Sequence, residues 1–243
     1  MSRGGWMPKI SDEGGEVVII ISAYAEWTAV MEYFHQPPVE TSPFGSYFNL
    51  QLGNRDVVLF HGGWGKIAAA ASAQYVIDRW QPGLVINLGT CGGLEDKTRV
   101  GEILLVEKTL VYDIYERMGD PAQALDHYTT QIDLSYLSEP YPQVVRRSLL
   151  VSADQDIDPD LVHKLVDDFD AIAADWESGA IAWTAHKNNV PCLILRAVSD
   201  LVDPMGGEIY ESDEFKERAE NVMLPLLRAL PNWIRCAFWG LTK

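Results

Sequence analysis

The sequence predicts an α/β protein: a single-domain, three-layer sandwich in which a mixed, twisted sheet lies between helices. Short apolar runs rich in β-branched residues, such as EVVIIIS (16–22) and GLVINLG (83–89), are typical of buried strands. They alternate with segments of helical periodicity, the pattern that places helices on both faces of a sheet. No linker-like stretch divides the 243 residues, so we expect one domain over 16–243 behind a flexible, Gly-rich leader, 1–15.

In the first half of the chain, the helix predicted at 65–80 carries its apolar residues on one face, which is typical of a helix packed on a core. The turn signal Gly53-Asn54 separates two strands. The expected elements are a strand at 16–22, a helix at 25–34 that ends at QPP, strands at 46–52 and 55–63, and the helix at 65–80.

In the second half, the polar, mixed stretch 116–140 is predicted to be a long loop and a lid. Two prolines, Pro225 and Pro231, are expected to break or bend the last helix, because proline removes a helical N–H donor. The other expected elements are strands at 83–89, 102–114, 148–152, 171–174 and 191–199, and helices at 158–169, 177–187 and from Ser212 onward.

Composition and charge exclude several classes of function. A net charge of −16 argues against nucleic-acid binding, which depends on clustered Lys and Arg. No run of about 18 apolar residues predicts a membrane span, and the N-terminus lacks the apolar region of a signal peptide. Three widely spaced cysteines without a CxxC pair indicate neither a disulfide framework nor a zinc site. We therefore expect a cytoplasmic protein without a metal.

Four polar segments follow or end predicted strands: SAYAEW (22–27), NLGTCGGL (87–94), DWESGA (175–180) and RAVSD (196–200). Each has a structural explanation by itself: a carboxylate in a helix's first turn, a turn with positive φ at GTCGG, or a structural ion pair between Arg196 and Asp200. Ligands of α/β sheets bind beyond the carboxyl ends of the strands. Because all four segments fall at such ends, we interpret them together as one site.

The chain resembles the nucleoside phosphorylase and nucleosidase superfamily, and within it the 5′-methylthioadenosine/S-adenosylhomocysteine nucleosidases. The resemblance lies in ordered motifs spread from about residue 16 to residue 205, and it implies the nucleoside phosphorylase/hydrolase-like fold. The motifs are GGWGKIAAA (62–70), VINLGTCGGL (85–94), VGEILLVEK (100–108), VSADQDID (151–158), DWESGAIA (175–182) and VPCLILRAVSDLVD (190–203).

The resemblance implies a role for each polar group. Asp200 matches the acid that protonates the purine at N7, and Ser199 is expected to orient it; such general acid catalysis contributes about 10²–10⁴-fold. Glu177 matches the carboxylate that binds the ribose 2′- and 3′-hydroxyls. Trp176 stands where the family usually has a methionine against the sugar.

Hydrolysis is favoured over phosphorolysis, because SAYAEW has no arginine or Gly-Asp-Pro to hold a phosphate, and Asn87 stands where many phosphorylases carry an arginine. Glu26 is expected to polarise a water held with Arg196, with Thr90 and Gly89 beside it. A register shifted by one residue would put Trp27 at the position of the base. A phosphate-dependent phosphorylase and a nucleoside-binding relative without activity remain alternatives.

The resemblance assigns the base pocket to Ile157, Asp156 and Ser199, with Asp158 as a further possibility, and leaves the identities of the purine and of the 5′ substituent open. It implies no cofactor. It also implies a homodimer in which Tyr112, Tyr115 and Met118 close the partner's pocket, although residues in such strands often pack within their own subunit.

Overall fold

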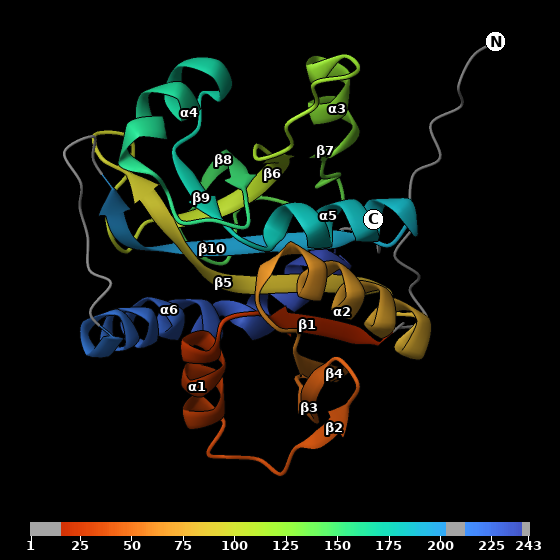
Figure 1. The fold of residues 1–243 in the computed structure, drawn as a ribbon. Coiled ribbons are helices and arrows are strands. Elements are labelled where there is room, and N and C mark those ends of the chain that lie inside the picture. Colours follow the sequence, from red (N-terminus) through yellow and green to blue (C-terminus); the bar gives the residue numbers. More distant parts are fainter. Residues whose placement is uncertain (1–15, 203–211, 240–243) are drawn as a thin grey trace.

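The computed structural model describes residues 16–202 and 212–239 (Figure 1). Within these residues, strands and helices alternate along most of the chain. The strands are β1 (Val17–Ile21), β2 (Glu40–Ser42), β3 (Gly45–Leu52), β4 (Arg55–His61), β5 (Leu84–Leu94), β6 (Ile103–Val111), β7 (Thr129–Gln131), β8 (Arg146–Ser152), β9 (Ala173–Asp175) and β10 (Cys192–Val202). The helices are α1 (Tyr24–Tyr33), α2 (Gly65–Trp80), α3 (Pro121–His127), a 3₁₀ turn (Pro159–Leu161), α4 (Val162–Phe169), α5 (Ser178–Lys187) and α6 (Ser212–Trp239).

The described strands form one mixed sheet in the order β10-β6-β8-β9-β5-β1-β4-β3-β2, with β7 beside β6. β5 also pairs with β10, in parallel, so β5, β10, β6, β8 and β9 form a closed ring of strands. β1 continues the sheet outward from β5 and pairs in parallel with β4. The two longest strands, β5 and β10, therefore run side by side from the open part of the sheet into the ring.

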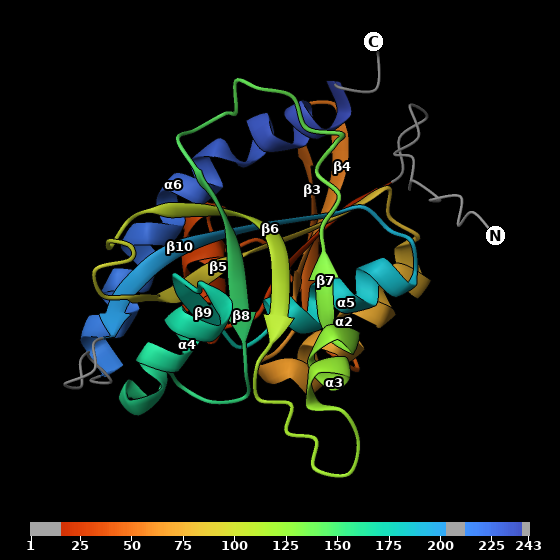
Figure 2. The ribbon, with the colours of Figure 1, turned by 90° about the horizontal axis from the view of Figure 1, so that it is seen from above.

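Helices cover both faces of the sheet (Figure 2). α6 packs on β10 and β5 and also contacts α1, whereas α2 and α5 pack against each other on the opposite face. The runs of Val, Ile and Leu in β1, β5 and β10 are fully buried between these layers. The predicted α/β architecture, a mixed sheet flanked by helices, is confirmed.

Three local expectations differ from the structure in whole or in part. The stretch 116–140 contains α3 and β7 and is not one long loop, because the β7 backbone bonds to β6. The GTCGG segment is not a turn, since it continues β5 as far as Leu94. The last helix was expected to break or bend at its prolines; it does not break, since one helix continues through Pro225 and Pro231. The predicted flexible leader, 1–15, lies outside the described residues.

A β-bulge lies near the end of β10. Val198 pairs with Cys91 and Asp200 pairs with Gly92, so Ser199 is an extra residue in β10 with no partner of its own in β5. Side chains alternate between the faces of a regular strand, but a bulge redirects them and allows two consecutive residues to face the same side. The bulge therefore explains how neighbours in the sequence can both reach one cavity.

Candidate active site

A cavity of about 560 Å³ opens where β5 and β10 approach their carboxyl ends. This volume is typical of small-molecule sites, which occupy roughly 300–1,000 Å³. Four of the segments that line it are the four polar segments singled out in the sequence, and the 155–157 loop adds a fifth. The lining residues are Ala23, Tyr24, Ala25, Glu26, Trp64, Thr90, Cys91, Gly92, Gln155, Asp156, Ile157, Ala174, Asp175, Trp176, Glu177, Ser199, Asp200 and Val202.

Ser199 and Asp200 both line the cavity, as the bulge in β10 allows. The Ser199 hydroxyl is buried and donates a hydrogen bond to Asp200 Oδ1. It also lies 3.3 Å from the Cys91 carbonyl oxygen in the neighbouring strand. These contacts fix the orientation of the Asp200 carboxyl, the arrangement expected of an acid and its orienting hydroxyl.

Glu26 faces the cavity, and Trp27 does not. Glu26 is only 3% exposed, and its Oε1 accepts hydrogen bonds from the Thr90 amide at 2.5 Å and the Thr90 hydroxyl at 3.0 Å. Its Oε2 accepts a bond from the Ala23 amide at the start of α1, at 3.1 Å. Successive residues of a helix point about 100° apart, and Trp27 accordingly packs on Phe48 and His61 in the core. The structure thus places the carboxylate, and not the indole, at the predicted position of the base.

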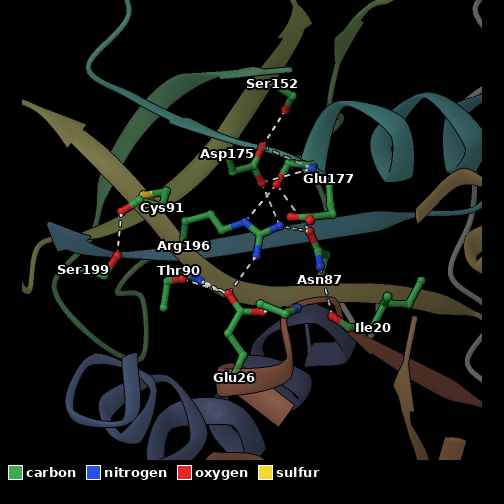
Figure 3. A network of polar contacts seen from close by, with 12 residues as sticks. Ile20, Glu26, Asn87, Thr90, Cys91, Ser152, Asp175, Glu177, Arg196 and Ser199 are labelled. Atoms are coloured by element: carbon green, nitrogen blue, oxygen red, sulfur yellow. Dashed lines mark hydrogen bonds and ion pairs between the residues drawn. The ribbon is translucent and has the colours of Figure 1, made fainter. Parts of the chain in front are cut away.

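Arg196 does not line the cavity, and its guanidinium lies among Glu26, Asn87, Asp175 and Glu177 (Figure 3). Its guanidinium is fully buried, and Nη2 lies 2.8 Å from both Asp175 Oδ2 and Asn87 Oδ1. Nε donates to the Ser178 hydroxyl at 2.9 Å. The remaining nitrogen, Nη1, lies 3.9 Å from Glu26 Oε1 and has no hydrogen-bond partner among the described residues. Arg196 does not pair with Asp200, so the ion pair considered in the sequence analysis is absent from the contacts of Arg196 that the structure shows.

Gly89 and Gly92 of the GTCGG segment lie where a Cβ atom would be too close to neighbouring side chains. A Cβ on Gly89 would overlap the Arg196 guanidinium and lie 2.7 Å from Glu26 Oε1. A Cβ on Gly92 would lie 2.9 Å from Ile157 Cδ1, which also lines the cavity. Gly89 does not itself line the cavity, although we expected it beside the water; its contribution is to leave room for Arg196 and Glu26.

Glu177 is the N-cap residue of α5 and is 6% exposed. Its Oε1 accepts a hydrogen bond from the Gly65 amide, the first residue of α2, at 3.1 Å. Burial, followed by the charge of Asp175, raises the pKa of Glu177 to about 8, although Arg196 acts in the opposite direction. The shift favours the protonated form of Glu177 in the substrate-free protein.

Aromatic and exposed side chains form the outer part of the cavity. Trp176 stacks on Trp64, with ring centroids 4.7 Å apart. Ile157 is buried against the cavity and Asp156 is an exposed lining residue, so both predicted base contacts lie at the site. Asp158 does not line the cavity; its carboxylate accepts a hydrogen bond from the Asp160 amide and caps the 3₁₀ turn.

The three residues predicted to close a partner's pocket differ from one another. Tyr112 packs in its own subunit against a hydrophobic cluster that includes Leu110 and Ile157. In contrast, Tyr115 is 77% exposed and Met118 is 99% exposed.

Sequence reasoning missed several residues of the site. Asp175 is buried, lines the cavity and pairs with Arg196, and it stood next to the quoted Trp176 and Glu177. At Asn87 the sequence indicates only that an arginine is missing, whereas in the structure its amide joins Arg196 to the Ile20 carbonyl oxygen. Trp64 lay inside a quoted motif, and nothing in its spacing indicated contact with Trp176.

No group of three or more His, Cys, Asp or Glu side chains in the described ranges is arranged to hold a metal ion. Nor does any helix within residues 16–202 and 212–239 combine the length and the apolar character needed to cross a bilayer.

Residues 16–230 match the family model of the phosphorylase superfamily, and the chain belongs to this superfamily. Within it, the chain is similar to curated 5′-methylthioadenosine/S-adenosylhomocysteine nucleosidases, as the resemblance in its motifs predicted. The relative from Tolumonas auensis is 30% identical over 177 residues, which cover 68% of this chain and 77% of the relative. The relative from Haemophilus influenzae strain PittEE is 30% identical over 210 residues, which cover 82% and 90% of the two chains.

Solved structures agree with the fold. The nucleosidase of the same name from Helicobacter pylori, solved with butyl-thio-DADMe-Immucillin-A, superimposes with a TM-score of 0.76 at 18% identity and covers 91% of this chain and 98% of its own. The Campylobacter jejuni nucleosidase gives a TM-score of 0.75 at 20% identity, with 91% and 99% of the two chains covered.

Proposed function

We propose that this protein hydrolyses the N-glycosidic bond of purine nucleosides of the 5′-methylthioadenosine and S-adenosylhomocysteine type and releases the free base. The observation that carries the proposal is the meeting of Glu26, Glu177 and Asp200 in one cavity. The names of the curated relatives support the same reaction.

Asp200 acts as the general acid. As the bond between C1′ and N9 breaks, its electron pair passes into the purine, and the Asp200 proton is transferred to N7. The hydroxyl of Ser199 holds the carboxyl in place for this transfer. General acid catalysis of this kind contributes about 10²–10⁴-fold to the rate.

Glu177 binds the ribose hydroxyls. Gly65 engages only Oε1, so the carboxyl keeps acceptor capacity for the sugar. The negative charges of this carboxyl cluster also favour the oxocarbenium ion that forms as the base departs. Trp176, beside it in the chain, supplies an apolar surface for the sugar and contacts Trp64 on its other side.

Water is the nucleophile, and Glu26 is its base. The water oxygen forms the new bond to C1′ and gives a proton to Glu26. Thr90 and Ala23 hold the Glu26 carboxylate, while Arg196 Nη1, which is 3.9 Å from Glu26 Oε1, is the buried cation beside it. Arg196 therefore acts from outside the cavity lining.

Phosphate is a poor alternative nucleophile in this cavity. The lining contains five carboxylate side chains and, among the described residues, no Lys, Arg or His; the carboxylates are Glu26, Asp156, Asp175, Glu177 and Asp200. Even with protons on Glu177 and Asp200, each remaining negative charge at short range in a partly buried site repels an anion by about 1–4 kcal/mol. A phosphate dianion would meet this repulsion without a compensating cation, which favours the hydrolase over the phosphorylase.

The base pocket is assigned to Ile157, Asp156 and Ser199. We also propose a homodimer, supported by exposed apolar side chains in the cavity lining, on α2 and on the segment after β6; these are Tyr24 and Trp64, Ile67, and Tyr115 and Met118. A partner that covers this surface would bring Tyr115 and Met118 to the neighbouring cavity.

The test measures base release from methylthioadenosine, adenosylhomocysteine, adenosine and inosine, with and without phosphate. We expect phosphate-independent release from at least one nucleoside, and Asp200→Asn should lower kcat at least about 10²-fold because the amide cannot supply the proton. Release that needs phosphate would indicate a phosphorylase. Binding without release would indicate an inactive relative, and near-normal turnover of the variant would remove Asp200 from its role.

A further inference from the structure

We propose that Lys66 is a positioning residue for Glu177: together with Asp113 and Asp154 it fixes the N-terminus of α2 where the Gly65 amide meets the sugar-binding carboxyl. The inference rests on the proposed function. It concerns residues outside the cavity lining, because Lys66, Asp113 and Asp154 do not line the cavity.

The N-terminus of α2 has no cap of its own. The N-cap residue, Trp64, makes no side-chain capping bond. The first N–H groups of a helix lack partners within the helix and attract negative charge. Here the Gly65 amide donates to Glu177 Oε1 at 3.1 Å, and the Lys66 amide donates to Asp154 Oδ1 at 2.7 Å. Two carboxylates from distant segments therefore cap α2, and one of them is the predicted ribose ligand.

Lys66 is an unfavourable residue for its position, since a cation in the first turn meets the positive end of the helix dipole. Its side chain is nevertheless only 19% exposed, which points to a specific purpose. The ammonium contacts Asp113 Oδ1 and lies 3.7 Å from Asp154 Oδ2. Asp113 Oδ2 in turn accepts a bond from the Asp154 amide at 3.0 Å. The lysine thus ties α2 to the segments that follow β6 and β8.

Neighbouring contacts restrict the same junction. Gly65 has φ +86°, a left-handed conformation that favours glycine, and a Cβ there would lie 3.2 Å from Asp154 Oδ1. Trp64 stacks on Trp176, so residues 64 and 65 contact residues 176 and 177 respectively. The position of the Gly65 amide is therefore set by three consecutive residues, 64–66, each attached to a different group.

Loss of the lysine should act through Glu177. Without the ammonium, Asp113 and Asp154 repel each other, and the start of α2 loses its fixed position. The Gly65 amide is the donor that favours the charged form of Glu177, so a weaker bond moves the pKa of Glu177 higher and leaves the carboxyl less ordered. We therefore expect a lower kcat/KM for the nucleoside, and we expect this loss only when Glu177 is intact.

The experiment is a double-mutant cycle on kcat/KM for base release, using Lys66→Met, Glu177→Gln and the double variant of the full chain. Lys66→Met keeps the aliphatic stem and removes the charge. We expect it to lower kcat/KM about 10-fold when Glu177 is present and less than about 2-fold in the Glu177→Gln background. In the pH profile of kcat/KM, the limb that depends on Glu177 should also lie at higher pH for Lys66→Met than for the wild type.

Arg147→Met is the matched control, because it removes a different ion pair, Arg147 with Glu107 at 2.8 Å, outside the cavity; it should leave kcat/KM within about 2-fold. If Lys66→Met does not fold, as judged by circular dichroism, Asp113→Asn takes its place in the same cycle. Equal losses in both backgrounds, with an unchanged pH profile, would overturn the positioning role. Failure of the proposed function would instead show as absence of base release by the wild-type protein.

Discussion

Glu26 and Glu177 contribute the same side chain to one cavity from opposite sides of Arg196 (Figure 3). They are almost equally buried, at 3% and 6% exposure. Glu26 accepts three hydrogen bonds, from the Ala23 amide and from the amide and hydroxyl of Thr90, whereas the structure gives Glu177 one, from the Gly65 amide. The comparison teaches that burial alone does not decide what a carboxyl can do; the number of donors aimed at it matters as much.

The difference fits two separate tasks. A base that accepts a proton from water must be held in a fixed orientation, and the three donors hold the Glu26 carboxylate in this way. In the proposed function Glu177 binds the sugar hydroxyls, and within the described residues the Gly65 amide is the one donor to its carboxyl, which leaves acceptor positions for a substrate. Its pKa of about 8 reflects burial with only one donor.

The largest expected effect comes from Glu26→Gln, which removes the base while keeping the size of the side chain. We expect kcat for base release to fall by about 10²–10⁴-fold. Trp27→Phe is the matched neighbour, since Trp27 packs on Phe48 in the core, and it should keep kcat within about 3-fold at a temperature where the fold is intact. The opposite ranking of these variants would show that the register assigned to α1 is wrong.

A smaller effect concerns the pH dependence of stability, and it tests Glu177. The pKa of Glu177 is raised from 4.5 to about 8 in the folded protein, so below pH 4.5 the group is protonated whether the chain is folded or not. Between these values only the unfolded chain releases the proton, and stability falls as the pH rises through about 8. Glu177→Gln removes this penalty, which is on the order of 5 kcal/mol at high pH.

The measurement is the melting temperature of Glu177→Gln and wild type from pH 5 to pH 9. The variant should be increasingly the more stable of the two as the pH rises, with the difference levelling off above about 8. Glu107→Gln, which alters an exposed ion pair, should show a nearly constant difference. A Glu177→Gln difference that is flat or shrinks with pH would show that Glu177 is charged in the folded protein at neutral pH.

The smallest expected effect comes from a variant in which Glu26, like Glu177, has fewer hydrogen-bond donors. Thr90→Val removes the hydroxyl donor to Glu26 Oε1 and leaves the amide donor in place. One hydrogen bond to a charged group contributes about 1.5–3 kcal/mol, but water can replace it in an open cavity, so we expect kcat to fall only about 3- to 10-fold. Thr90→Ser should restore most of the activity. A loss as great as that of Glu26→Gln would mean that the hydroxyl contacts the reacting water directly.

The sequence was sufficient for the strands whose side chains are buried on both faces, because runs such as VVIII in β1 have no other common structure. It was insufficient for the outer halves of β5 and β10. The GTCGG segment has the composition of a turn, and it is extended only because β10 and β9 supply backbone partners from far along the chain. Local propensity does not contain such pairing.

The candidate site shows the same limit. The motifs identified Asp200, Glu177 and the segment that holds Glu26, but they did not show which of Glu26 and Trp27 faces the cavity, because tertiary packing on Phe48 and His61 sets the rotation of α1. Nor did they show that Arg196 lies outside the cavity lining, or that Lys66 pairs with carboxylates 47 and 88 residues away. These facts depend on which distant segments meet.

The closed ring of β5, β10, β6, β8 and β9 makes one part of the cavity more rigid than the other. Thr90 and Asp200 lie within the ring strands β5 and β10, where Thr90 pairs with Ala197 and Asp200 with Gly92, so the sheet limits how far these groups can shift. Tyr24, Trp64 and Asp156, in contrast, are exposed and lie outside those strands. Substitutions at these outer positions can change which nucleoside fits while the bond-breaking chemistry stays the same, and this is where related sequences with a different preference should diverge first.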